Sequence, residues 1–385
     1  MTFNFRERID RVHSDSVKWA KYAGKDILPL WIADSDYRTA PCVIEALQQR
    51  VAHGIFGYPV APEKVAEACM AWLARHHQWQ VPREWLVVLP GTQCAIEIIL
   101  RYLSRPDQAS ITTSLHYPPF SQFAHRLQRR QSLMPVRQSG QHWQMPVSVP
   151  ETEMRGDEKW LFLCNPHNPG GYVYEREELL QLQAFARRHD LLVCSDEVHA
   201  DLVLTAGKKH QPFAALNEDA AQRTITLFSP AKTFNIAGLG LSVAIIADPH
   251  LRGRFLQATE GLLAPPAITG MIAAEAAWEH GDDWLQAQQE FLRINRDQLA
   301  DAVGKIPGIN MITPQATSLA WIDARGLAVD FPALWFEQHG LGFSAGGPFG
   351  DPQCVRMNYA CHPQTLAQAI GRLALAAQAA TGCIS

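Results

Sequence analysis

The chain has 385 residues, of which 47% are hydrophobic and 19% are charged, and 34 Lys and Arg residues stand against 38 Asp and Glu residues. This length allows a large buried core and more than one domain, and the weakly acidic balance gives no reason to expect nucleic acid as a partner. No apolar run approaches the roughly 18–20 residues that span a bilayer, and the N-terminal segment lacks the apolar region of a secretory signal, so we expect a cytoplasmic protein without a membrane partner.

The middle of the chain alternates short apolar runs with segments of helical spacing. We expect strands at Trp85–Leu89, Trp160–Cys164, Leu191–Cys194, Thr224–Phe228 and Leu241–Ile246. Helical spacing covers Gln93–Leu103 and Glu175–His189. Strands and helices in this order predict an α/β fold, with a large domain built around a mostly parallel sheet.

The last third of the chain has a different pattern. Long helices are expected at 269–278 and 283–303, and short strands at 318–322 and 355–359 precede a final Ala-rich helix. This pattern predicts a smaller α+β domain packed against the first. The predicted boundaries are 1–45 for an N-terminal segment that joins the small domain, 46–275 for the large domain and 276–385 for the small domain.

The cysteines are widely spread and form no C-x-x-C pair. They are Cys42, Cys69, Cys94, Cys164, Cys194, Cys354, Cys361 and Cys383. Most stand beside apolar residues, so we expect buried free thiols in a reducing compartment rather than a disulfide framework or a zinc site.

Polar clusters stand at the ends of several expected strands. They are Gly91-Thr92, Asn168, Asp196 and Ser229–Lys232. Parallel sheets bind their ligands just beyond the carboxyl ends of the strands. We therefore expect these four clusters to line one cleft.

Lys232 stands out because no other charged residue occurs between Thr224 and Ala247. A lysine in such surroundings is desolvated, which lowers its pKa. A low pKa is what an amine needs to form a Schiff base. The alternative is a lysine whose charged end extends to the surface.

A second cluster suggests another interpretation, a metal site. It contains Asp196, Glu197, His199 and Asp201. We expect no metal, because strand alternation would send Asp196 to the opposite face from the other three.

Four motifs carry a family resemblance. Residues 229–239 read S-P-A-K-T-F-N-I-A-G-L, 31–37 read W-I-A-D-S-D-Y, 53–58 read H-G-I-F-G-Y and 195–201 read S-D-E-V-H-A-D. In this order they resemble the fold-type I pyridoxal-phosphate enzymes of the aminotransferase class I/II superfamily. The chain looks most like the MalY/PatB-like branch of cystathionine β-lyases and related C–S lyases, in which Met stands at the position of Ser35.

The resemblance extends from about Lys18 to Tyr359. It implies pyridoxal 5′-phosphate as the cofactor and a seven-stranded-type sheet in the large domain. The partner it implies for the chain is a second copy, in a homodimer with shared active sites.

The resemblance also implies roles around the cofactor ring. Lys232 would carry the cofactor and move the proton at the substrate Cα, and Asp196 would pair with the pyridine nitrogen. Asn168 and His199 would contact the ring oxygen, and Tyr117 would stack on the ring. The residue types alone leave alternatives: Asp196 as a cap of backbone amides, His199 as a core histidine and Tyr117 as a packing residue.

The cofactor phosphate would be held at the turn that begins a helix. Gly91, Thr92 and Gln93 occupy this turn, and helix starts favour anions. Ser229 matches a further phosphate ligand of the family. Tyr58 matches a tyrosine that reaches the phosphate of the neighbouring subunit.

The remaining implied residues bind substrate. Arg356 would hold the substrate α-carboxylate through two hydrogen bonds, and its alternative is a structural salt bridge. Ala33 and Asp34, in the 31–37 motif, complete the expected substrate site.

The function that the resemblance implies is a C–S β-lyase. It would cleave cystathionine or a related cysteine S-conjugate to pyruvate, ammonia and a thiol. An aminotransferase of a small amino acid is the alternative with the same site. A cofactor-binding or regulatory protein with little catalysis is a third hypothesis, which the apparent completeness of the site disfavours.

Overall fold

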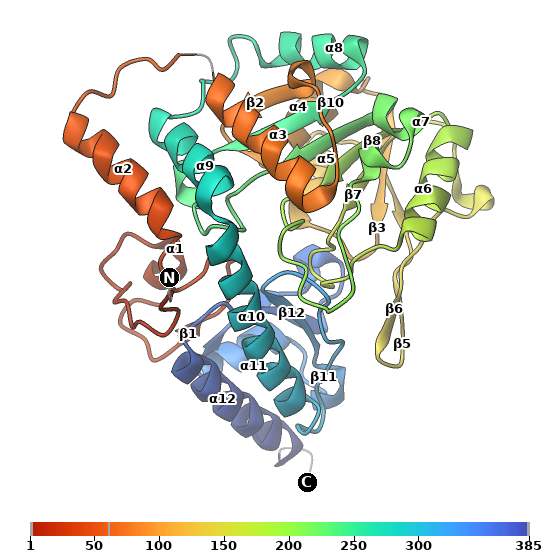
Figure 1. Cartoon of the computed structure of the whole chain (residues 1–385). Coiled ribbons are helices and arrows are strands. Elements are labelled where there is room, and N and C mark those ends of the chain that lie inside the picture. Colours follow the sequence, from red (N-terminus) through yellow and green to blue (C-terminus); the bar gives the residue numbers. More distant parts are fainter. Residues whose placement is uncertain (1–2, 61, 383–385) are drawn as a thin grey trace.

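A large sheet lies at the centre of one half of the molecule (Figure 1). The computed structural model describes residues 3–60 and 62–382. Within these residues the sheet has seven strands, in the order β2 (Leu86–Leu89), β10 (Ser242–Ile246), β9 (Thr224–Phe228), β8 (Leu192–Asp196), β7 (Glu158–Cys164), β3 (Ala109–Thr113) and β4 (Gln131–Met134). Of these strands, β10 alone runs antiparallel to its neighbours. The other strands therefore all end at one edge.

Helices cover both faces of this sheet (Figure 1). They include α3 (Glu63–His77), α4 (Thr92–Ile98), α5 (Pro118–Arg126), α6 (Arg176–Arg188), α7 (Glu218–Gln222), α8 (Pro249–Thr259) and α9 (Ile268–His280). In β7, Trp160 and Phe162 pack into a core with α4, α5 and α8, whereas Leu161 and Leu163 pack into another with α6. Both faces of the strand are buried, so it appears in the sequence as an unbroken apolar run.

A smaller antiparallel sheet forms the other half, drawn in blue in Figure 1. Its strands are β11 (Asn310–Met311), β12 (Leu319–Asp323), β15 (Cys354–Asn358) and β14 (Ser344–Ala345). The helices around it are α10 (Asp282–Val303), α11 (Pro332–Gln338) and α12 (Pro363–Gly382). The N-terminal segment contributes to this half, because β1 (Leu28–Pro29) pairs with β13 (Leu341–Gly342).

Three further elements lie outside the two sheets. They are α1 (Val17–Ala20), α2 (Pro41–His53) and the hairpin of β5 (Arg137–Ser139) and β6 (His142–Gln144). The hairpin projects from the large half, and α2 packs beside α9 (Figure 1).

The structure confirms the α/β class and the predicted strands, with small changes at their ends. Trp85 belongs to a short 3₁₀ turn rather than to β2, and the helix expected over 93–103 is α4 followed by a π-helical turn. The predicted separation of Asp196 from His199 by strand alternation is wrong, because β8 ends at Asp196 and the following residues form a turn.

The cysteines follow the prediction only in part. Those in the described residues are free, but Cys42 and Cys94 are half-buried rather than buried. Cys383 lies outside the described residues. Among the described helices, none combines the length and apolar character needed to cross a membrane.

The interior position of β7 in the large sheet leads to a stability prediction. Leu161 is fully buried in β7, so Leu161→Ala should leave a cavity and lower the free energy of unfolding by about 2–5 kcal/mol. Leu133, in the edge strand β4, is 44% exposed, and Leu133→Ala is the matched control with a much smaller expected loss. Urea unfolding of both variants measures the difference. Equal losses would contradict the described burial.

Candidate active site

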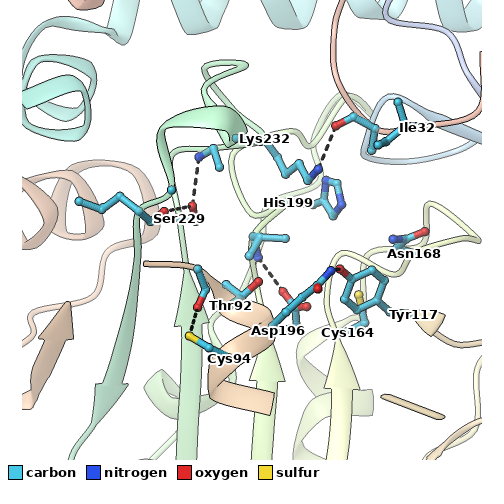
Figure 2. Close-up of a pocket in the computed structure, with 18 of the residues that line it drawn as sticks. Ile32, Thr92, Cys94, Tyr117, Cys164, Asn168, Asp196, His199, Ser229 and Lys232 are labelled. Atoms are coloured by element: carbon cyan, nitrogen blue, oxygen red, sulfur yellow. Dashed lines mark hydrogen bonds between the residues drawn. The ribbon is translucent and has the colours of Figure 1, made fainter. Parts of the chain in front are cut away.

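A pocket lies beyond the carboxyl ends of the strands of the large sheet (Figure 2). Its volume of about 490 Å³ is within the range of small-molecule sites. Most of the sequence-predicted site residues line it together. They are Ala33, Gly91, Thr92, Gln93, Tyr117, Asn168, Asp196, His199, Ser229, Lys232 and Arg356. The predicted convergence of the four polar clusters on one cleft is therefore confirmed.

Lys232 lies in the turn that follows β9. Its Nζ donates a hydrogen bond to the carbonyl oxygen of Ala33 at 2.9 Å. Burial, and then the positive charge of Arg356, lower the pKa of Lys232 to about 8. The alternative of an amine extended to the surface is wrong, because this amine lines the pocket.

Asp196 is the last residue of β8 and is buried. Its Oδ1 accepts a hydrogen bond from the backbone N–H of Val198 at 3.3 Å. Burial raises the pKa of Asp196 to about 7, although nearby Lys232 opposes the rise. No ion pair within the described residues includes Asp196, so this carboxylate is suited to a cationic group of a ligand.

Arg356 projects from β15 of the smaller sheet and is buried. Its Nη1 donates to Oδ1 of Asn168 at 2.9 Å, and its Nη2 donates to the carbonyl oxygen of Trp31 at 3.1 Å. Burial lowers the pKa of Arg356 to about 10. The salt-bridge alternative is wrong, because no carboxylate of the described residues pairs with Arg356. A buried cation of this kind is suited to an anionic group of a ligand.

The predicted phosphate residues lie on two adjoining turns. Gly91 precedes α4, which begins with Thr92 and Gln93, and Gln93 Nε2 donates to the hydroxyl of Tyr117 at 3.1 Å. Ser229 is buried, and its Oγ donates to the carbonyl oxygen of Leu241 at 2.7 Å. Leu241 stands just before the antiparallel strand β10, so the start of this strand joins the same edge.

His199 is both buried and part of the pocket wall. Burial lowers its pKa to about 3, so its imidazole is neutral. Its Nδ1 is buried without a hydrogen-bond partner among the described residues, and buried polar atoms of this kind are rare in folded proteins. Among the described residues, His, Cys, Asp and Glu form no group of three or more arranged for a metal ion.

Two predicted residues lie away from the pocket. Tyr58 is fully exposed on the extended segment after α2. Asp34 is absent from the pocket wall, and its Oδ2 pairs with Arg11 at 2.8 Å. Lys18, which is fully buried, donates to Asp36 at 2.9 Å and to the carbonyl oxygen of Asp34 at 3.1 Å. Asp34 therefore takes part in holding the 31–37 segment whose Ala33 lines the pocket.

Sequence reasoning also missed residues of the pocket wall. Cys94 lines it, and its thiol donates to the carbonyl oxygen of Gly91 at 2.8 Å. Cys164 lines it as the last residue of β7, beside Tyr117 and Asn168 in Figure 2. Their positions at a helix start and at a strand end are the signal that would have found them.

The low pKa of Lys232 can be tested in the protein without bound ligand. Arg356 and burial both disfavour the ammonium form, so the Lys232 amine should titrate near pH 8 and Arg356→Met should move its midpoint upward. Carbon-13 NMR of lysine labelled at Cε measures both midpoints. Arg137→Met, at an exposed position in β5, is the control and should have no effect. A wild-type midpoint at the ordinary value of about 10.4 would contradict the described surroundings.

Comparisons with known proteins agree with this architecture. The family model for aminotransferase class I and II matches residues 25–373. Cystathionine beta-lyase PatB from Bacillus subtilis is 33% identical over 96% of this chain and 98% of its own. The solved structure of OvoB is 51% identical, with a TM-score of 0.95 over 97% of this chain and 99% of that chain. Cystalysin from Treponema denticola, which contains a pyridoxal 5′-phosphate cofactor, is 27% identical, with a TM-score of 0.93 over 98% and 100% of the two chains. The chain therefore belongs to the aminotransferase class I and II family.

Proposed function

We propose that this protein is a pyridoxal-phosphate-dependent C–S β-lyase. It cleaves cystathionine or a related cysteine S-conjugate, with water, to pyruvate, ammonia and a thiol. One observation carries the proposal: the amine of Lys232, the carboxylate of Asp196 and the guanidinium of Arg356 line one pocket, and none forms an ion pair within the described residues. The amine matches the aldehyde of the cofactor, and the carboxylate matches its pyridinium. The guanidinium matches the carboxylate of the substrate.

The residues present fit the cofactor. Asp196 is a buried carboxyl group without a paired cation among the described residues, so it can take the charge of a protonated pyridine nitrogen. Arg356 has only donors, so the atom of Asn168 that faces it is the amide oxygen, which leaves Nδ2 to donate to the ring oxygen. The Nδ1 of His199 has no hydrogen-bond partner among the described residues and would be a second group to contact the ring oxygen. Gly91, Thr92, Gln93 and Ser229 would hold the phosphate.

The proposed roles follow from the charges. When bound, pyridoxal phosphate supplies an electron sink for the charge left on Cα after proton removal. Lys232 would hold the cofactor through its amine, and the same amine would accept the substrate Cα proton, for which its low pKa is suited. Arg356 holds the α-carboxylate and so fixes Cα beside this amine.

The comparisons support a lyase over an aminotransferase. The relative that is 33% identical along nearly its full length is named a cystathionine β-lyase, and His199 stands where many transaminases have Tyr. An aminotransferase would use the same pocket, so the assay below includes it.

We also propose that the active form is a homodimer. The segment after α2 carries the exposed apolar residues Ile55, Phe56, Tyr58 and Val60. A run of such side chains on an extended segment favours a protein partner. A second copy is the partner that also gives Tyr58 its implied place at the neighbouring phosphate.

Two further parts of the proposal concern organisation and location. We propose a division into a large and a small domain near residues 45 and 275, positions that fall inside α2 and α9. The grouping of large-sheet strands between 86 and 246 and small-sheet strands between 310 and 358 supports the two-domain division. We propose a cytoplasmic location, which the free thiols of the described cysteines support.

The lyase proposal is tested with L-cystathionine as the only substrate. The purified holoenzyme should release pyruvate, ammonia and thiol in equal amounts over many turnovers, and Lys232→Ala should lower the rate by about 100- to 10,000-fold because the proton acceptor is lost. Release of nothing until a 2-oxo acid is added would instead identify an aminotransferase. A cofactor absorbance band without turnover under either condition would identify a binding protein.

A charged residue introduced into the exposed segment after α2 tests the dimer proposal. Phe56→Asp places a carboxylate in the proposed apolar interface, so the mass in sedimentation should fall from about twice 42.9 kDa to the single-chain value. Leu375→Asp, at an exposed apolar position on α12, is the matched control and should leave the mass unchanged. A wild-type protein that sediments as a single chain would refute the proposal.

A further inference from the structure

Arg356 carries a buried positive charge among neutral partners. Its hydrogen bonds reach Asn168 and Trp31, and a longer one of 3.5 Å reaches the hydroxyl of Ser344. Its Nε has no hydrogen-bond partner among the described residues. These acceptors are neutral, so they do not supply the negative charge that stabilises a buried guanidinium before the substrate arrives.

The ring of Phe349 meets this need. The guanidinium carbon of Arg356 lies 4.6 Å from the centroid of this ring, within the range of a cation–π interaction. The face of an aromatic ring carries partial negative charge without being an anion. It can therefore stabilise the guanidinium and still leave its donors to a carboxylate.

Neighbouring residues fix the ring in place. Trp321 and Arg356 are paired across β12 and β15, and the indole of Trp321 packs against Phe349 with its ring centroid 5.7 Å away. Phe349 is only 5% exposed. The side chain of Phe349 is therefore held between the indole of Trp321 and the guanidinium of Arg356.

The backbone of Phe349 is fixed as well. Its carbonyl oxygen accepts a hydrogen bond from the backbone N–H of His116 at 3.0 Å, which joins this turn of the smaller half to the segment before Tyr117. The next residue, Gly350, has a φ of +110°, and a side chain there would clash with the carbonyl of Ser114. The turn thus depends on glycine to bring Phe349 against the large half.

We propose that Phe349 is a positioning residue that holds the Arg356 guanidinium in the orientation that binds the substrate carboxylate. The inference rests on the proposed function only in the identity of the ligand as an α-carboxylate. Loss of the ring face should leave Arg356 free to move and should weaken carboxylate binding in particular. A residue that only fills space would affect carboxylate and uncharged ligands alike.

The test measures binding rather than turnover. Calorimetry on the holoenzyme gives the Kd of 3-(methylthio)propanoate and of 3-(methylthio)propanamide, which lack the amino group and cannot react. We expect Phe349→Leu to weaken the carboxylate by about 30-fold, as a desolvated cation–π interaction of about 2 kcal/mol implies, and the amide by less than about 2-fold. Phe349→Tyr keeps the ring face and should restore binding of the carboxylate.

A matched control separates this effect from general damage to the smaller half. Phe336, on α11, is fully buried and packs edge-on against Phe343 at 5.4 Å, and no cation of the described residues lies over its ring. Phe336→Leu should therefore leave the ratio of the two Kd values unchanged. Equal weakening of both probes by Phe349→Leu, or no change in either, would overturn the proposal.

A second series applies even if Phe349→Leu does not fold. Mono-, di- and trifluorinated phenylalanine at position 349 withdraws charge from the ring face with little change in size. The Kd of the carboxylate should rise stepwise with each fluorine while the Kd of the amide stays constant. A flat series would refute the role of the ring face. The wild-type preference for the carboxylate stands as a separate result, so a protein that binds carboxylates but cleaves no C–S bond would refute the proposed function and leave this inference intact.

Discussion

The guanidinium of Arg356 joins three parts of the chain that are remote in sequence. It extends from the smaller sheet to Asn168, in a turn of the large half, and to Trp31, in the N-terminal segment. The same N-terminal segment is held by Asn358, which donates to the carbonyls of Ile32 and Asp34. Because the carbonyl oxygen of Ala33 then accepts from Lys232, the position of the amine depends on the position of the guanidinium.

The charged groups of the pocket are surrounded by neutral polar groups and an aromatic ring rather than by ions of opposite charge. Burying an unpaired ion costs several kcal/mol, and the described residues offer no ionic partner to the amine of Lys232, the carboxylate of Asp196 or the guanidinium of Arg356. The protein offsets part of this cost with fixed dipoles and an aromatic face rather than with counter-ions. Counter-ions would stabilise the fold further, but they would also occupy the places that a ligand must take. A site of this kind is preorganised for charges that arrive with the ligand.

Local patterns predicted much of this arrangement and missed the parts that depend on distant contacts. The unbroken apolar runs located the strands, and the charge-free surroundings of Lys232 indicated its burial. Lysine is almost always exposed, yet Lys18 is fully buried because Asp36 lies beside it in space. Its sequence neighbours Val17 and Trp19 give no sign of this ion pair. Phe349 shows no local sign of its contact with Arg356, because that contact arises from a turn between strands. Asp34 stands next to Ala33, but it turns away from the pocket to meet Arg11.

The long sequence separations across the pocket have a consequence for how the protein folds. The hydrogen bond from Lys232 to Ala33 spans 199 residues, and that from Arg356 to Asn168 spans 188. Contacts between such distant positions form only after a large loss of chain entropy, so they come late in folding. The two halves also share one hydrophobic core, which contains Val243 of β10 and Val355 of β15, so the ligand pocket forms only as the halves come together. During synthesis on the ribosome, the pocket is completed only after β15, near the end of the chain, has emerged.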